Sequence, residues 1–379
     1  MNEVYLTAIE KYMPNEPVSN DEMENILGLI NGNMSKAKGL ILRNNRIKTR
    51  YYALDKDGNP THTNAQLASL AIHKLIKDRV SLSEIDLLTA GTSSPDTMQP
   101  SHALMVHGEL GTDNNMEVMS PHGTCNAGML SLKYAYMALK AGEYDQAISA
   151  ASETLSSWMH AKNFDGEIDK RKEIEDNPYI AFEKDFLRWM LSDGAAAALL
   201  QTHPAKSGRS LRIEWIDVKS YANELETCMY AGCIKNEDGT VTGWRELSAE
   251  EQKINSVFTL KQDAKVLGKH IINYGIKHLE TVCEKRKLDL DEVDWLLPHL
   301  SSMFFKKEAF NKLKETIKEI PIEKWFINLP EVGNVGAASA FLMIEELFNS
   351  DKLESGQKIL VMVPESARFS STYMLMTVV

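Results

Sequence analysis

A repeat within the chain is the feature that most restricts its fold. Residues 81–94, SLSEIDLLTAGTSS, align with residues 289–302, DLDEVDWLLPHLSS, at a shift of 208 positions, and six of the fourteen pairs are identical. A helical pattern precedes each copy, and a turn of small residues, an apolar helix, a glycine and an apolar strand follow it. Because these elements recur in the same order, the sequence predicts two similar halves, residues 1–203 and 204–379, packed on each other.

Apolar strands alternate with helical segments along the chain, which indicates an α/β fold. The strands are short apolar runs without polar alternation, as expected of a sheet that is covered on both faces. Residues 191–200, LSDGAAAALL, predict a turn at Asp193 and Gly194 followed by another buried strand. The predicted strands are residues 3–9, 85–91 and 145–152, and the predicted helices are 68–78 and 127–142, the second closed by Gly142.

Composition excludes several classes of protein. The chain has 379 residues, 43% hydrophobic and 25% charged, with a net charge of −11 and no long basic run, so nucleic-acid binding is disfavoured. No apolar run reaches about 18 residues, and the start, MNEVYLTAIEKYMP, lacks a basic stretch followed by an apolar one. We therefore expect neither membrane insertion nor a signal peptide. The four cysteines form no CxxC pair, so we expect no metal site, no disulfide scaffold and a cytoplasmic location.

One cysteine stands among unusually small neighbours. Cys125 lies in SPHGTCNAG (120–128), directly before the helical pattern of residues 127–142. A cysteine taken alone is more often a packed core residue. Here the glycines and alanine leave room around the thiol, and a helix N-terminus stabilises a thiolate through its dipole and free N–H groups. The pattern therefore predicts a nucleophile.

Two further residues are expected close to Cys125. In the repeat alignment Cys125 corresponds to Gly333, beside Asn334, so both turns lead from a strand into a helix. His299 lies just past the end of the strand DWLLP. Ligand chemistry in α/β sheets gathers at such strand ends, so these residues could converge at the interface of the halves, where a histidine would also favour the thiolate.

In this context the chain resembles the β-ketoacyl synthase III branch of the thiolase superfamily. The resemblance rests on GTCNAG, LSDGAAAALL, a histidine after an apolar strand and GNVGAAS (333–339), in that order over nearly the whole chain. It implies a duplicated, five-layered αβαβα fold and a homodimer. It also implies that Cys125 is acylated, that His299 and Asn334 complete the catalytic set, and that no cofactor is needed.

The resemblance also implies a two-step reaction. The thiolate attacks an acyl thioester of CoA or of acyl carrier protein, and the Cys125 N–H contributes to an oxyanion hole. A malonyl-type or β-ketoacyl thioester then supplies the second carbon nucleophile, in the malonyl case by losing CO₂. The imidazole N–H and the asparagine amide can both donate to the resulting enolate. The outcome is a decarboxylative Claisen condensation through a covalent intermediate.

The chain departs from the family pattern at several places. HLSS (299–302) replaces His-Gln-Ala-Asn, and PESARFSS (364–371) replaces a glycine-rich turn, so the second oxyanion donor is expected to be the Ala367 N–H, without a positive φ. The loop 43–50 carries four basic residues that could bind CoA phosphates or a carrier protein, or simply be solvated: Arg43, Arg46, Lys48 and Arg50. Residues 154–190 are longer than usual and are predicted to cap an acyl tunnel.

Two other functions stay open at this stage. The protein could be an acyltransferase that passes the acyl group from Cys125 to an oxygen or nitrogen nucleophile, or a non-catalytic subunit of a heterodimer. Asn334 argues against the first, because an amide donor suits an enolate better than base catalysis, and the complete Cys–His–Asn set argues against the second. FLRWMLSDGAA (186–196) also resembles ketosynthases of specialised lipid pathways, such as those for aryl polyenes and dialkylresorcinols.

Overall fold

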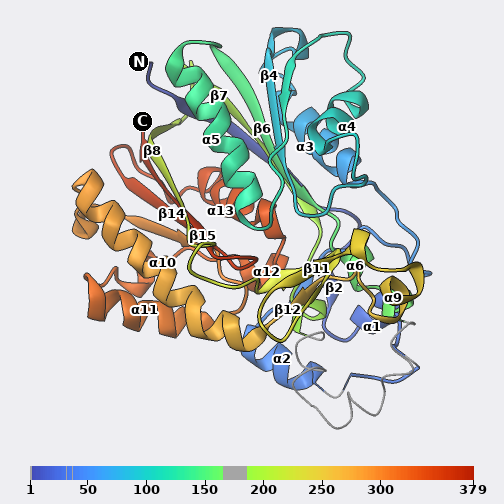
Figure 1. Ribbon diagram of the computed structural model, residues 1–379. Helices are drawn as coiled ribbons and strands as arrows, with labels where there is room; N and C mark the ends of the chain where they lie inside the picture. Colours follow the sequence, from blue (N-terminus) through green and yellow to red (C-terminus); the bar gives the residue numbers. More distant parts are fainter. Residues whose placement is uncertain (1, 31, 36, 165–185) are drawn as a thin grey trace.

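Nine strands build one continuous sheet in the computed structural model, which describes residues 2–30, 32–35, 37–164 and 186–379 (Figure 1). Their order is β13-β14-β15-β8-β1-β7-β6-β4-β5. The strands are β1 Tyr5–Tyr12, β4 Leu87–Gly91, β5 Glu117–Met119, β6 Gln146–Glu153, β7 Gly194–Gln201, β8 Leu211–Ser220, β13 Trp295–Pro298, β14 Lys358–Glu365 and β15 Ser370–Val378.

The same arrangement of strands occurs on both sides of the junction between β1 and β8. β4 is parallel to β6, and β6 is antiparallel to β7; β13 is parallel to β14, and β14 is antiparallel to β15. The registers correspond as well, since Leu87 pairs with Ala147 as Trp295 pairs with Ile359. The sheet therefore has the duplicated architecture that the repeat predicts, while the boundary between residues 203 and 204 stays a prediction.

Helices cover both faces of each half of the sheet, so that five layers result (Figure 1). The strands β6 and β7 are almost completely buried, as their continuous apolar runs predict. Gly142 ends the first central helix in the left-handed conformation, with φ of 85°, as the sequence indicates. The outer helices are α3 (Asn64–Ile76) and α4 (His102–Glu109) on one side and α10 (Ala264–Arg286) and α11 (Phe304–Thr316) on the other, and the central ones are α5 (Asn126–Ala141) and α13 (Ser339–Phe348).

Most of the shorter elements gather in the lower part of the molecule as drawn in Figure 1. No described helix is both long and apolar enough to cross a membrane. The short helices are α1 (Met23–Leu27), α2 (Lys38–Asn45), α6 (Ser156–Met159), α9 (Ala249–Ile254) and α12 (Leu329–Val332), with a 3₁₀ turn η6 at Gly336–Ala338. The paired short strands are β2 (Val18–Ser19) with β3 (Thr49–Arg50), β9 (Met229–Tyr230) with β12 (Lys261–Gln262), and β10 (Cys233–Lys235) with β11 (Val241–Gly243).

Only part of the predicted cap, residues 154–190, belongs to the described part of the chain. Residues 165–185 lie outside the described part of the chain. On its two sides, Leu155 and Met190 are buried and line the cavity that also contains Cys125. The role of the segment as a cap stays a prediction.

Candidate active site

Cys125 is the N-cap residue of α5, at the centre of the molecule. It is 8% exposed, and its side chain makes no capping hydrogen bond. The small residues around it allow the two halves to approach each other closely. A β-carbon on Gly128 would lie only 2.3 Å from the Ala337 carbonyl oxygen, and one on Gly91 would lie 2.2 Å from that of Ala127. The glycines therefore serve helix packing, in addition to any approach by a substrate.

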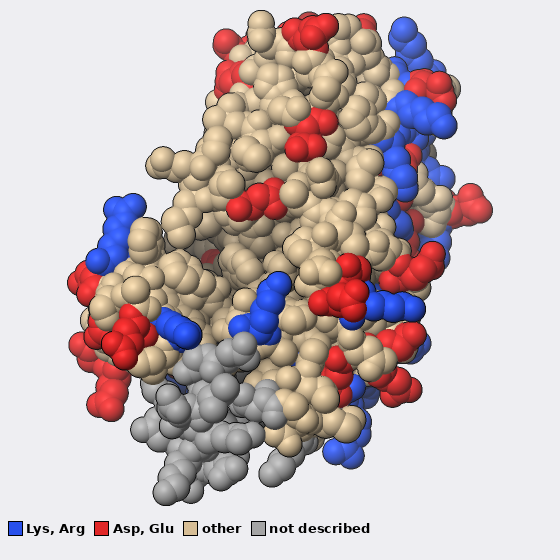
Figure 2. Space-filling view, turned by 90° about the vertical axis from the view of Figure 1, so that its right-hand side faces the viewer, with Lys and Arg blue, Asp and Glu red and all other residues tan. Residues whose placement is uncertain are grey.

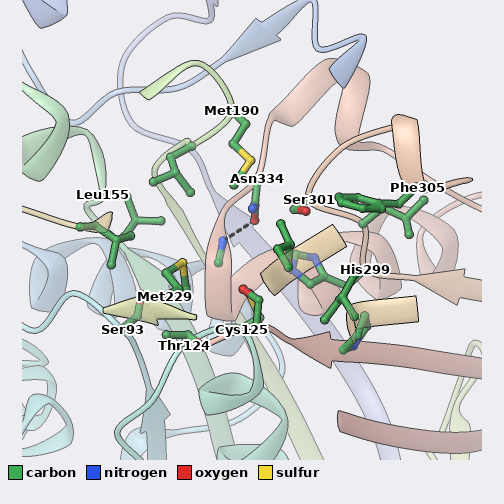
Figure 3. A pocket seen from close by; sticks show the side chains of 18 of the residues that line it. Ser93, Thr124, Cys125, Leu155, Met190, Met229, His299, Ser301, Phe305 and Asn334 are labelled. Carbon is green, nitrogen blue, oxygen red and sulfur yellow. Dashed lines mark hydrogen bonds between the residues drawn. The ribbon is translucent and has the colours of Figure 1, made fainter. Parts of the chain in front are cut away.

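The three predicted catalytic residues line one cavity of about 40 Å³ (Figure 3). His299 follows β13, and its backbone N–H donates to the Met362 carbonyl at 2.8 Å, which continues the pairing with β14. Asn334 is held by backbone hydrogen bonds of 2.9 Å to Met190 and Ser192. The structure thus brings Cys125, His299 and Asn334 together from both halves, as the repeat alignment suggests.

The side-chain amide of Asn334 is oriented by its own turn. Its Oδ1 accepts from the Gly336 N–H at 3.0 Å, the contact drawn in Figure 3, and from the Ser339 hydroxyl at 3.4 Å. With the oxygen occupied inside the turn, the NH₂ group is the part of the amide that remains for a ligand in the cavity. Asn334 is therefore arranged as a donor.

Burial keeps the Cys125 thiol and the His299 ring uncharged in the resting site. Burial raises the pKa of the Cys125 thiol, and the carboxylates of Glu365 and Glu153 raise it further. This is the opposite of the thiolate stabilisation expected from the helix N-terminus, because desolvation of a buried anion outweighs the helix dipole. Burial also lowers the pKa of His299 to about 4, so its imidazole is neutral at pH 7 and can donate or accept one hydrogen bond.

The neutral state of His299 has a consequence for stability. Because its pKa is about 4 when folded and near 6.5 when unfolded, the unfolded chain binds more protons in this interval, and stability falls as the pH drops from 6.5 towards 4. We expect the free energy of unfolding to fall less between pH 7 and pH 4 in His299→Asn than in the wild type. The difference should be on the order of 3 kcal/mol.

Urea unfolding at pH 7 and pH 4 measures this difference. The matched control is the exposed His203→Asn, which should follow the wild type at both values. Equal acid sensitivity of His299→Asn and the wild type would contradict the burial of a neutral imidazole.

Apolar side chains form most of the cavity wall, among them Leu155, Met190 and Phe305 (Figure 3). A wider groove of about 650 Å³ adjoins it and shares Ser93, Thr124, Met229 and Leu260 with it. The aromatic side chains of Trp158, Tyr230, Trp244 and Phe258 also line this groove. Together these spaces could receive an apolar chain attached at Cys125. Among the described residues, no cluster of three or more His, Cys, Asp or Glu could hold a metal ion.

The four basic candidates of the loop 43–50 differ in their exposure to solvent. Arg50 is completely buried and donates to Asn20 Oδ1 at 2.8 Å and to the Trp189 carbonyl at 3.2 Å, so its assignment to CoA phosphates is wrong. The other three, Arg43, Arg46 and Lys48, are exposed. Lys48 lies 3.6 Å from the carboxylate of Glu331.

Sequence reasoning missed a lysine next to this loop. Burial lowers the pKa of Lys306, and the positive charge of Arg46 lowers it further, so the two cations lie near each other. Lys306 follows Phe305, which lines the cavity. Nothing in the spacing of α11 distinguishes Lys306 from Lys307 and the other polar residues of this helix, because the proximity of Arg46 depends on the tertiary fold.

The β14–β15 turn differs from the expectation in one respect. Ala367 has no positive φ, as predicted; the left-handed residue is Phe369, with φ of 58°. However, the Ala367 N–H donates to Glu365 Oε1 at 2.8 Å, and Ala367 lines the wider groove. The residue of this turn that lines the Cys125 cavity is Ser366, whose N–H has no partner among the described residues. A second oxyanion donor is therefore more directly available at Ser366.

The chain is similar to known proteins in sequence and in fold. Residues 283–363 match the family model described as 3-oxoacyl-[acyl-carrier-protein] synthase III C terminal. The β-ketoacyl-[acyl-carrier-protein] synthase III of Clostridium acetobutylicum is 22% identical over 368 residues, covering 95% of this chain and 94% of that protein. One from Clostridium perfringens is 24% identical over 354 residues, covering 92% of each.

Solved structures give the same fold. The tetronic acid condensing enzyme AbyA1 superposes with a TM-score of 0.74 at 18% identity, covering 99% of both chains. The synthase III of Aquifex aeolicus has a TM-score of 0.70, also at 18% identity, again over 99% of both. The chain is a synthase III-like protein with the thiolase fold. The predicted fold class is thereby confirmed, and the synthase III-like chain carries its cysteine, histidine and asparagine candidates in a shared cavity.

Proposed function

We propose that this synthase III-like protein is a ketosynthase that joins a Cys125-bound acyl group to the enolate of a second thioester by Claisen condensation. The observation that carries the proposal is the shared cavity of Cys125, His299 and Asn334, with the Asn334 amide oriented to donate. The similarity to condensing enzymes over almost the entire chain supports it.

The first half-reaction loads the enzyme. The Cys125 sulfur attacks the thioester carbonyl, the carbon–sulfur bond to the carrier breaks, and the thiol proton ends on the leaving sulfur. Because a neutral thiol is a weak nucleophile, the proton must leave as the bond forms, and the neutral His299 ring in the same cavity can accept it transiently. N–H groups of Cys125 and of the β14–β15 turn would stabilise the tetrahedral oxyanion.

The second half-reaction forms the carbon–carbon bond. A malonyl-type thioester loses CO₂, and its electron pair becomes an enolate whose oxygen accepts hydrogen bonds from His299 and Asn334. The enolate carbon attacks the acyl carbonyl, and the Cys125 sulfur leaves and regains a proton. Neutral donors suit this step, because they stabilise the enolate without protonating it irreversibly.

Incubation of the protein with acyl-CoA, followed by intact-mass spectrometry and then by malonyl-CoA, tests the proposal. An acyl adduct that disappears with release of CO₂ and a β-ketoacyl product is the expected result. Transfer of the acyl group to an amine or alcohol without CO₂ release would favour the acyltransferase alternative. Absence of any adduct with acyl-CoA and acyl carrier protein donors would favour a non-catalytic subunit.

The binding surface that we assign to the thioester carrier consists of two cations near the cavity. Arg46 and Lys306 would contact phosphate groups of CoA or of the carrier protein, whereas Arg50 is engaged internally. We expect Arg46→Ala and Lys306→Ala to raise the KM for acyl-CoA several-fold at low salt with little change in kcat, and the difference to shrink at high salt. Steady-state kinetics at two ionic strengths measures this. Lys312→Ala, in the same helix, is the control; an equal effect there would contradict a local site.

A homodimer is part of the proposal. The strand β5 ends the sheet with a free edge among the described residues, and Leu104 on α4, the helix that packs against β5, is 50% exposed. The middle of the face in Figure 2 carries few charged side chains. Sheet edges and exposed apolar patches are typical of association surfaces. The homodimer and the cytoplasmic location otherwise stay predictions.

A further inference from the structure

A buried carboxylate lies beside the nucleophile at the end of β14. Glu365 is 8% exposed, and its carboxylate accepts from the Thr124 hydroxyl, from the Ala367 N–H at 2.8 Å and from the Ser370 hydroxyl at 2.8 Å. Among the described residues, no lysine or arginine forms an ion pair with it. A buried charge that is held only by hydroxyl and amide donors is costly, so its retention calls for an explanation.

The hydrogen bonds of Glu365 reach both sides of Cys125. Thr124 precedes the nucleophile and donates directly to the carboxylate. Asn126 follows it, and its Nδ2 donates at 2.7 Å to the Ser370 hydroxyl, which in turn donates to Glu365. The start of α5 is thereby attached on both flanks to the hairpin of the opposite half, which also contains Ser366 and Ala367.

Glu365 has a counterpart in the first half. Glu153 is the last residue of β6, as Glu365 is of β14, and each pairs with the first residue of the following strand. Glu153 accepts from the Ala337 N–H at 2.9 Å, and a β-carbon on Gly336 would lie 2.7 Å from its Oε1. Each glutamate therefore holds the start of the central helix of the other half, one beside Cys125 and one beside Asn334.

We propose that Glu365 is a positioning residue for the reaction at Cys125: its hydrogen bonds fix the nucleophile relative to the β14–β15 turn. The same carboxylate also faces the thiol, so its negative charge disfavours the thiolate in the unliganded protein. Glu153 positions the turn that carries Asn334 in the corresponding way, through its hydrogen bond from the Ala337 N–H. The part of this proposal that concerns acyl transfer rests on the proposed function, whereas the part that concerns the thiol does not.

Among the described residues, three ionisable groups face the Cys125 thiol. They are Glu365 from β14, Glu153 from β6 and the neutral His299 that follows β13. Glu365 also lies close enough to Cys228 to raise the pKa of that thiol, although burial is the main cause there. Removing the charge of Glu365 while keeping its shape should therefore make Cys125 more acidic, because one like charge is lost.

Alkylation of Cys125 by iodoacetamide at pH 8, followed by intact-mass spectrometry with peptide mapping, tests the charge. Because this pH lies well below the pKa of the buried thiol, the alkylation rate is proportional to the fraction of thiolate. We expect Cys125 in Glu365→Gln to be alkylated about tenfold faster than in the wild type. The control is Glu345→Gln, which removes a buried carboxylate on α13 that is paired with Lys11; it should leave the rate unchanged. An unchanged rate in Glu365→Gln would overturn the proposed role of the charge, whether or not the protein forms an acyl-enzyme.

Acylation rates test the positioning. Glutamine can still accept from Thr124 and Ala367 through one oxygen, so Glu365→Gln should acylate at or above the wild-type rate. Glu365→Ala should lower kcat for acylation about tenfold or more with a smaller change in KM, because the nucleophile is no longer fixed. Thr124→Val removes one hydrogen-bond donor to Glu365 and keeps the shape of the side chain. It should also lower kcat for acylation, and it provides the test if Glu365→Ala fails to fold. Equal rates in the alanine and glutamine proteins, or a normal rate in Thr124→Val, would overturn the positioning role.

Discussion

Replacing Cys125 with alanine or serine is expected to abolish the acyl-enzyme and all condensation while the protein stays folded. The thiol makes no capping hydrogen bond to α5, so the start of the helix does not depend on it. Serine retains the size of the group but is a far weaker nucleophile with no ionised form near neutral pH. Intact-mass spectrometry after addition of acyl-CoA measures the adduct, and circular dichroism verifies the fold.

The other three cysteines provide the control for this result. Cys228 is completely buried, and burial raises its pKa to about 12; Cys283 is partly buried, with its pKa raised to about 11. Neither lines the cavity that contains His299 and Asn334. Cys228→Ser and Cys283→Ser should therefore acylate normally. An adduct that persists in Cys125→Ala and maps to one of these residues or to Cys233 would show that the nucleophile is elsewhere.

The repeat made most of the fold predictable. The shift of 208 places β13 on β4, and the structure pairs β4 with β6 and β13 with β14 in parallel, each from the first residue of the strand. Local signals were sufficient for this, because strands covered on both faces read as continuous apolar runs. The same reasoning correctly placed His299 after β13 and Asn334 at the turn opposite Cys125.

The properties that sequence reasoning did not predict depend on contacts between distant segments. Arg50 reads as part of an exposed basic loop, but its partners Asn20 and Trp189 come from segments 30 and 139 residues away. The raised pKa of Cys125 likewise results from burial by both halves and from two carboxylates, which no local pattern reveals. Glu365 could have been noticed by aligning residues 358–365 on 146–153, since both strands end in glutamate.

Loss of the Asn334 amide is expected to separate the two half-reactions. In Asn334→Asp the Gly336 N–H keeps an oxygen to donate to, so the turn is retained, but an acceptor replaces the NH₂ donor that faces the cavity. Self-acylation of Cys125 should slow much less than the second step, because the added carboxylate disfavours the thiolate but removes no group that acts on the acyl donor. Release of CO₂ from malonyl-CoA should slow by roughly 10²-fold or more, because one donor to the developing enolate is lost and a negative charge is added beside it.

Asn334→Ala should show the same separation, with some added loss of stability from the missing bond to Gly336. The matched control is Asn328→Ala, a buried asparagine of the same region whose Nδ2 donates to Glu346 at 3.0 Å and which does not line the cavity. Single-turnover acylation and release of labelled CO₂ measure the two steps separately. Equal damage to both steps would argue against the enolate role, because the amide would then act before decarboxylation begins. Normal rates of both steps in Asn334→Asp would instead favour acyl transfer to an oxygen or nitrogen nucleophile, a reaction in which no enolate forms and the amide has no charge to stabilise.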